Sequence, residues 1–253
     1  MKIVAVSDIH TDARTMGKER FDEVERGLVE AVEVAIDGKA GLFAFCGDLC
    51  DPDDARDVLR ALALAMDVAI YMAGRGVTSL WLSGNHDVCG DGETTTLEPL
   101  RVAGEKLYGS LVGKIHAATQ ESCFFCVGDS SPYREKIAVL ALPYSPRPYD
   151  ADAALRKAAK DAGTLPLYVF SHIMLPDMHL GSESAEMLRG KDRAFPLDAM
   201  REVKPALVVQ GHYHRAQKTR DGIHVVGSLA RLTFGEERHD PGYLLVDTGF
   251  RST

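Results

Sequence analysis

Short runs of apolar residues alternate along the chain with longer stretches in which apolar positions recur every three or four residues. The continuous runs predict buried β-strands at residues 2–7, 42–46, 79–83, 137–142, 167–171 and 206–210. The longer periodic stretches predict helices at residues 21–36, 54–73 and 151–161. Strands that alternate with helices in this way are typical of an α/β fold with a largely parallel sheet.

The rest of the chain carries a weaker pattern. Residues 222–226 and 242–247 are predicted to be short strands between turn residues, which indicates an antiparallel end to the fold. Residues 90–131 have the weakest pattern, and we assign them no function. Residues 181–193 are polar and contain glycines, which predicts a mobile loop. No repeat or linker divides the chain, so we expect a single domain over residues 1–253.

The composition narrows the class of protein. Of the 253 residues, 45% are hydrophobic and 26% are charged, which excludes disordered, collagen-like and coiled-coil chains. The formal net charge of −8 gives no sign of a large basic face for nucleic acid. The negative net charge argues against binding of nucleic acid. Two bound divalent ions would weaken that argument, because they would add four positive charges.

The sequence predicts a cytoplasmic protein that does not contact a membrane. The first ten residues are interrupted by Asp8 too early to form a signal peptide, and no apolar run approaches the roughly 20 residues that span a bilayer. An odd number of cysteines, five, favours reduced thiols. Cys123 and Cys126 have the spacing of a zinc or redox pair, but they lie in an apolar run without a second pair nearby, which favours a plain strand.

Side chains that bind metals follow five of the predicted strands. They are Asp8, His10, Asp48, Asn85, His172, His212 and His214. Ligand sites of open parallel sheets lie beyond the carboxyl ends of the strands, so we expect these side chains to converge. Any one of them alone would be read as a turn, a helix cap or surface polarity. Five of the nine histidines lie in these segments, whereas His116, His224 and His239 lack such a setting.

The residue types indicate the chemistry. Aspartate and histidine without cysteine suit manganese, iron or zinc, and seven candidates exceed the needs of one ion. We therefore predict two divalent ions about 3.5–4 Å apart and bridged by a carboxylate, an arrangement that activates water and clamps a phosphoryl group. His86 is then placed to act as general acid, and Asp87 is expected to hydrogen-bond its imidazole. His179, in the loop after His172, is a weaker candidate for contacting substrate.

The order of these motifs resembles that of the calcineurin-like metallophosphoesterase superfamily. The matching motifs are Asp8-X-His10, Gly47-Asp48, Gly84-Asn85-His86-Asp87, His172 and Gly211-His212-X-His214. The resemblance implies a four-layer α/β/β/α sandwich with a dinuclear site, and it implies that His86 assists at the leaving group or the scissile phosphate. It also implies that Asp48 bridges the two ions. One ion would be held by Asp8, His10, Asp48 and His214, and the other by Asp48, Asn85, His172 and His212.

Two further segments resemble the SbcD-type DNA-repair exonucleases. They are Gly47-Asp48-Leu49-Cys50-Asp51 and the tail at residues 227–236, which is followed by residues 242–246. The likeness implies a nuclease in which the Gly227-Ser228 turn lies beside the metals. Arg231 would approach a backbone phosphate, although a surface salt bridge is nearly as good an interpretation. SbcD-type subunits continue into a capping domain and a segment that docks on an SMC-like ATPase. We expect residues 1–253 to hold the catalytic core only, so an ATPase partner is left open.

These observations favour a two-metal phosphodiesterase that acts on nucleic acid, with Mn²⁺ as the ion implied by the resemblance and Fe, Zn or Mg as alternatives. A phosphoesterase for small molecules, such as cyclic nucleotides or nucleotide phosphates, is the alternative. A phosphoprotein phosphatase fits less well, because Asp48 is followed by Leu-Cys-Asp-Pro instead of the X-Val-Asp-Arg-Gly of those enzymes. A non-catalytic scaffold fits least, because every expected ligand is present. The oligomeric state is left open.

Overall fold

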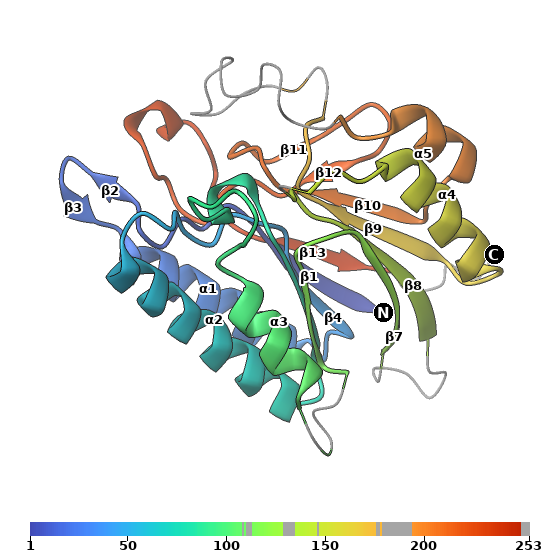
Figure 1. Ribbon diagram of the computed structural model, residues 1–253, viewed down its shortest axis with the longest axis horizontal. Coiled ribbons are helices and arrows are strands. Elements are labelled where there is room, and N and C mark those ends of the chain that lie inside the picture. The colour runs from blue at the N-terminus through green and yellow to red at the C-terminus, as the bar shows by residue number, and fades with distance from the viewer. Residues whose placement is uncertain are drawn as a thin grey trace.

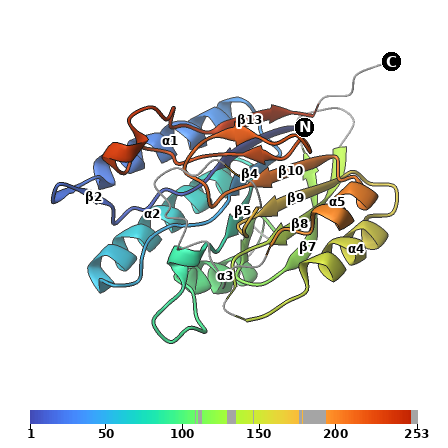
Figure 2. The ribbon, with the colours of Figure 1, turned by 90° about the horizontal axis from the view of Figure 1, so that it is seen from above.

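The computed structural model describes residues 1–107, 109, 113–128, 135–145, 147–175, 178 and 194–248. Two β-sheets pack face to face, and helices cover the outer face of each sheet (Figure 1). Seen from above, α1 and α2 lie on one side of the sheets and α4 and α5 on the other (Figure 2). This arrangement confirms the α/β/β/α sandwich predicted from the sequence.

The first sheet has the strand order β13-β1-β4-β5-β6. Its strands are β1 (Lys2–Val6), β4 (Leu42–Phe45), β5 (Thr78–Leu82), β6 (Ile115–Ala118) and β13 (Leu244–Asp247). All are parallel except β13, which runs antiparallel to β1 at the edge of the sheet. The helices on this side are α1 (Phe21–Asp37), α2 (Ala55–Gly74) and α3 (Glu98–Glu105).

The second sheet has the order β11-β12-β10-β9-β8-β7. Its strands are β7 (Ser122–Gly128), β8 (Glu135–Leu142), β9 (Leu167–Ser171), β10 (Leu207–Gln210), β11 (Gln217–Lys218) and β12 (His224–Val225). The four central strands are parallel, and β7 and β11 are antiparallel. The outer helices are α4 (Ala151–Ala162) and α5 (Leu197–Val203). A small hairpin, β2 (Arg14–Thr15) with β3 (Lys18–Glu19), and two short 3₁₀ turns, η1 (Asn85–Asp87) and η3 (Phe234–Glu236), complete the fold.

The strands are apolar throughout because both of their faces are buried. In β1, Ile3 and Ala5 pack between the two sheets, whereas Val4 and Val6 pack against the helices. In β8 the alternation is the same, with Val139 between the sheets and Leu140 under the outer helices. Side chains alternate across a strand, so a strand covered on both sides reads as a continuous apolar run. This is why the sequence revealed these strands so clearly.

Aspartate side chains define where two of the predicted helices begin. Asp54 precedes α2 and accepts a hydrogen bond from the backbone N–H of Arg56, and Asp150 precedes α4 and accepts one from Ala153. Such caps satisfy backbone donors that have no partner within the first turn of a helix.

Elements with little buried surface escaped prediction. The structure places α3 and β6 within residues 90–131, where the sequence pattern was weakest, and adds the short helix α5. Only Leu100 of α3 is buried, so the helix shows no clear apolar stripe. The predicted loop at residues 181–193 lies outside the described residues. Among the helices that are described, none combines the length and the apolar character needed to cross a bilayer.

Candidate metal centre

The carboxyl ends of strands from both sheets meet at one edge of the sandwich. Strands β1, β4 and β5 are parallel in the first sheet, and β9 and β10 are parallel in the second. Asn85 follows β5, and its Oδ1 lies 3.2 Å from His172 Nε2 and 2.9 Å from His212 Nδ1. Side chains from the two sheets are therefore in direct contact at this edge.

Strained backbone at this edge aims the side chains inward. Asp8, His10, Asp48 and His212 all have positive φ angles, of 50°, 41°, 62° and 74°. The left-handed region costs a residue with a Cβ about 1–2 kcal/mol and is retained mainly where function requires it. Four of the seven predicted ligands adopt it, each two to four residues after its strand ends.

Two glycines allow the segments to approach closely. A Cβ at Gly47 would lie 2.0 Å from Nδ1 of His172, and a Cβ at Gly84 would lie 2.0 Å from Oδ1 of Asp48. Both separations are far shorter than atomic contact allows. Glycine immediately before Asp48 and Asn85 is therefore a requirement of packing at this edge.

The first group of candidate ligands is Asp8, His10 and His214, whose donor atoms lie within 4.8 Å of one another. Both carboxylate oxygens of Asp8 are buried, and neither has a hydrogen-bond partner in the described part of the chain. Burial raises the pKa of Asp8 to about 6 and lowers the pKa of His10 to about 3. A buried carboxylate without hydrogen bonds is costly unless a cation compensates it, so this group fits a metal ion.

The second group is Asp48, His172 and His212, within the same 4.8 Å limit. Asp48 Oδ2 lies 3.2 Å from His172 Nε2 and 3.7 Å from His10 Nε2, so this carboxylate lies between the two groups. Burial favours the protonated form of Asp48, but the nearby imidazoles outweigh it and hold its pKa well below the usual range. Burial likewise lowers the pKa of His172, but the Asp48 carboxylate outweighs it and raises that pKa to about 9.

The donors available at this edge are oxygen and nitrogen atoms. Cys46 and Cys50 are also buried nearby, and burial raises the pKa of both thiols, so they remain protonated and poor ligands. Carboxylate and imidazole donors suit divalent ions of the manganese, iron and zinc type. The residues present therefore fit a pair of such ions.

His86 lies next to both groups. Its Nδ1 is 2.8 Å from Oδ1 of Asp51, and its backbone N–H donates to Oδ1 of Asp48 at 2.9 Å. Its ring packs edge-on against the ring of His10, with 4.8 Å between centroids. Burial alone would lower the pKa of His86, but the hydrogen bond to Asp51 and the charge of Asp48 raise it to about 9.

Asp87 does not contact the His86 imidazole, so the prediction that Asp87 hydrogen-bonds and orients this imidazole was wrong. The Asp87 carboxylate is fully buried and accepts hydrogen bonds from four backbone N–H groups and one hydroxyl, which belong to Gly84, Asp48, Leu49, Cys50 and Thr96. It holds the Asp48 loop against the Gly84 turn. Asp51 takes the orienting position, and no local signal in the sequence distinguishes it from Asp87.

The remaining predicted site residues have simpler surroundings. Arg231 is exposed, and its Nε donates to the backbone carbonyl of His239 at 2.9 Å, so its contact with a phosphate stays a prediction. His179 lies outside the described residues. His116 stacks on Phe124, with 4.0 Å between centroids, as expected of a histidine without a catalytic role.

The tail after β12 lies beside the candidate ligands. The backbone N–H of Ser228 donates to the carbonyl of His214 at 3.0 Å. Glu236, which was not singled out from the sequence, is buried, and its Oε1 lies 2.8 Å from Nδ1 of His214.

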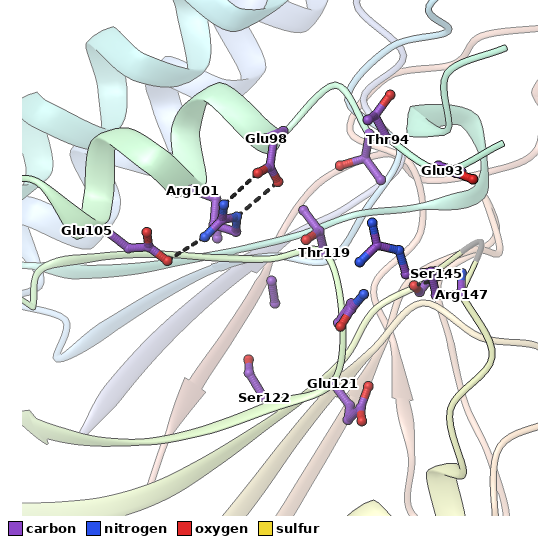
Figure 3. Close-up of a pocket in the computed structure, with 14 residues that line it drawn as sticks. Glu93, Thr94, Glu98, Arg101, Glu105, Thr119, Glu121, Ser122, Ser145 and Arg147 are labelled. Atoms are coloured by element: carbon purple, nitrogen blue, oxygen red, sulfur yellow. Dashed lines mark hydrogen bonds and ion pairs between the residues drawn. The ribbon is translucent and has the colours of Figure 1, made fainter. Parts of the chain in front are cut away.

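A pocket of about 440 Å³ lies next to this edge, between α3, the end of β6 and the loop after β8 (Figure 3). Ser83, which leads into the Gly84 turn, donates its N–H to Ala118 and accepts from the N–H of Tyr144, so the pocket walls are bonded to the site. Arg101 in the pocket is paired with Glu98 and Glu105 (Figure 3). The charged lining residues are Glu93, Glu98, Glu105, Glu121, Arg101 and Arg147, so acidic groups predominate.

Comparisons with known proteins agree with this geometry. A family model described as calcineurin-like phosphoesterase matches residues 1–216. No curated protein matches the chain.

Three solved structures match the chain, and the first two, with TM-scores above 0.5, are similar in fold. GAP50, the anchor in the inner membrane complex of Plasmodium, is 11% identical with a TM-score of 0.55, covering 97% of this chain and 80% of that one. A candidate 5′-nucleotidase from Staphylococcus aureus is 13% identical with a TM-score of 0.51, covering 90% of this chain and 48% of that one. A dimetal phosphatase from Danio rerio is 12% identical with a TM-score of 0.47, covering 90% and 87%.

Proposed function

The chain belongs to the calcineurin-like phosphoesterase family, and we propose that this metal-dependent hydrolase cleaves phosphodiester bonds, with nucleic acid as its substrate. The observation that carries the proposal is the buried Asp8 carboxylate, which has no hydrogen-bond partner among the described residues and lies in one group with His10 and His214. Such a carboxylate is stable in a folded protein when a cation binds it.

The two groups of side chains divide naturally between two ions. One ion would be held by Asp8, His10, Asp48 and His214, and the other by Asp48, Asn85, His172 and His212. The position of Asp48 between His10 and His172 supports its role as the shared ligand. Mn²⁺ is the ion that we propose, with Fe, Zn and Mg as alternatives that the oxygen and nitrogen donors also accept.

The chain's own residues account for the rest of the chemistry. When bound, the ions supply Lewis acidity that activates water and neutralises a phosphoryl group. Asp51 accepts the Nδ1–H of His86 and orients the ring. His86 then carries its transferable proton on Nε2, where it can be donated to the leaving alkoxide.

Support for a nucleic acid substrate comes from the tail. The segment 227–236 resembles the corresponding part of SbcD-type nucleases, in which the Gly-Ser turn lies beside the metals. In this chain the N–H of Ser228 is bonded to the carbonyl of His214, a proposed ligand. This hydrogen bond supports the proposal, because it brings the Gly-Ser turn beside a proposed ligand.

One observation favours the alternative, a small-molecule phosphoester. The pocket beside the site is lined by four glutamates and two arginines, and the whole chain has a net charge of −8. A long polyanion depends on lysine and arginine contacts for affinity, whereas a small substrate needs few of them. A cyclic nucleotide or nucleotide phosphate would meet less repulsion here than a DNA strand.

A substrate panel distinguishes these functions. Metal-free protein is reloaded with Mn²⁺ and offered bis-p-nitrophenyl phosphate, p-nitrophenyl phosphate, cyclic nucleotides, and labelled single- and double-stranded DNA. We expect cleavage of the diester and of DNA, and no cleavage by the Asp48→Asn variant. Activity on the monoester alone would exclude the nuclease, and activity on cyclic nucleotides without DNA cleavage would establish the alternative.

A further inference from the structure

The hydrophobic effect alone does not explain the burial of Glu236. Its side chain is fully buried at the end of the turn η3, whereas Phe234 in the same turn is 72% exposed. Burial of a carboxylate is unfavourable unless its oxygens are paired, and exposure of a phenyl ring forfeits apolar burial. The turn therefore directs the carboxylate inward for its contacts there.

Those contacts use both carboxylate oxygens. Oε1 lies 2.8 Å from Nδ1 of His214, and Oε2 accepts the backbone N–H of Leu232 at 2.7 Å. The second bond ties the carboxylate to the backbone just before its own turn, in addition to the contact with His214. The turn thus presents a preplaced acceptor to the imidazole.

The contact determines the tautomer of His214. An ionised carboxylate can only accept, so Nδ1 of His214 carries the proton and Nε2 keeps its lone pair. Partners of this kind orient a ligating histidine and raise its basicity. Two other histidines among the proposed ligands have neutral partners at Nδ1: the carbonyl of Cys46 for His172 and the side-chain amide oxygen of Asn85 for His212.

From this geometry we infer that Glu236 is a positioning residue that sets the affinity of one ion, the one held with Asp8, His10 and His214. The inference rests on the proposed function only in its assignment of these residues as metal ligands. Glu236 acts through His214 and does not touch the ion or the substrate. It lies beyond residue 216, where the match to the family model ends.

The test measures metal binding directly. Metal-free wild-type protein, Glu236→Ala and Glu236→Gln are titrated with Mn²⁺ by calorimetry. We expect two binding events in the wild type and, in Glu236→Ala, one event weakened about 10- to 100-fold while the other is unchanged. Glu236→Gln should fall between them, because its amide oxygen can still accept one of the two hydrogen bonds. The matched control is Glu237→Ala, which removes the exposed neighbouring carboxylate.

A spectroscopic readout separates positioning from general loss of structure. In metal-free protein with ¹⁵N-labelled histidine, His214 should show a protonated Nδ1 in the wild type and in Glu237→Ala, and a mixture of tautomers in Glu236→Ala. Should Glu236→Ala fail to fold, Glu236→Gln, which keeps the volume, decides by the same titration.

The outcomes distinguish this inference from the proposed function. Two events of wild-type affinity in Glu236→Ala, or equal weakening of both, would overturn the inference while leaving phosphodiester hydrolysis untouched. A selective loss of one event in a protein that cleaves no phosphodiester would support the inference and refute the proposed function. A wild-type protein that binds none of Mn²⁺, Zn²⁺ and Mg²⁺ would overturn both.

Discussion

The imidazole of His86 is held by the carboxylate of Asp51, with 2.8 Å between Nδ1 and Oδ1. The carboxylate accepts the Nδ1–H, which leaves Nε2 as the nitrogen that can exchange a proton with a substrate. Asp51 itself is less buried than the proposed ligands, with its side chain 40% exposed. The pair therefore lies at the rim of the cluster, where a leaving group can depart.

We expect His86→Ala to lower kcat about 10²- to 10⁴-fold, the usual contribution of a general acid, without loss of bound metal. Asp51→Asn should lower kcat less, because the amide oxygen still accepts the Nδ1–H but carries no charge. Asp53→Asn, which changes an exposed acid in the same loop, is the control. Elemental analysis accompanies the kinetics, and a missing ion in His86→Ala would identify His86 as a ligand.

Asp48→Asn is expected to weaken both ions, because this side chain lies between the two groups. Asp8→Asn, by contrast, should weaken one ion and leave the other bound. Calorimetric titration of the two metal-free variants with Mn²⁺ measures the difference. Two ions bound with wild-type affinity in Asp48→Asn would contradict its position as the shared ligand.

Chelation should destabilise the protein, because it leaves the buried Asp8 carboxylate uncompensated. An ion present at 100 times its Kd stabilises the fold by about 2.7 kcal/mol. Removal with EDTA should therefore lower Tm in the wild type. Metal-free Asp8→Asn should be at least as stable as metal-free wild type, since a neutral amide is less costly to bury. A metal-free Asp8→Asn protein much less stable than the metal-free wild type would argue against an uncompensated charge.

Asp87→Ala should lower the free energy of unfolding by about 3 kcal/mol or more, because it leaves buried N–H groups without an acceptor. Thr96→Val removes only one of the hydrogen bonds to Asp87 and should cost about 1 kcal/mol. Urea denaturation of both metal-free variants provides the comparison. An Asp87→Ala protein that is as stable as wild type but inactive would support a catalytic role for Asp87 instead of a structural one.

Gly84→Ala should disrupt metal binding through simple lack of space. Its φ of −99° is open to any residue, so the obstacle is the 2.0 Å separation between an added Cβ and Oδ1 of Asp48. Gly90→Ala is the matched control, because no atom lies within 4 Å of its Cβ position. Mn²⁺ titration should show weakened binding for the first variant and wild-type binding for the second.

The central strands and the converging ligands could be predicted because each has a local signature. A strand buried on both faces reads as a continuous apolar run, and parallel strands carry the residues that follow them to one edge. Asp8 and His172 each follow such a run directly, and Asp48 follows one closely. Asp48 differs only in that Gly47 stands between it and its run, and for all three residues the chemistry of the side chain and its place in the pattern lead to the same conclusion.

The residues that escaped prediction depend on contacts between distant segments. Nothing local distinguishes Asp51 from Asp87 as the partner of His86, because both are acids close to a ligand in the chain. Which carboxylate is left to bind His86 depends on which one accepts hydrogen bonds from the backbone N–H groups of the Asp48 loop. These N–H groups donate to Asp87. Glu236 was missed for the same reason: 22 residues separate it from His214, and its burial comes from the turn around it.

Because the two sheets contribute their ligands in chain order, a growing polypeptide cannot assemble the centre in stages. Asp8, His10 and Asp48 leave the ribosome long before His212 and His214, and the edge of the first sheet is completed only when β13 pairs with β1. Binding of metal by the complete set of proposed ligands is therefore expected to be a late event of biosynthesis. A chain interrupted before its last hundred residues would carry four of the seven proposed ligands and no complete centre.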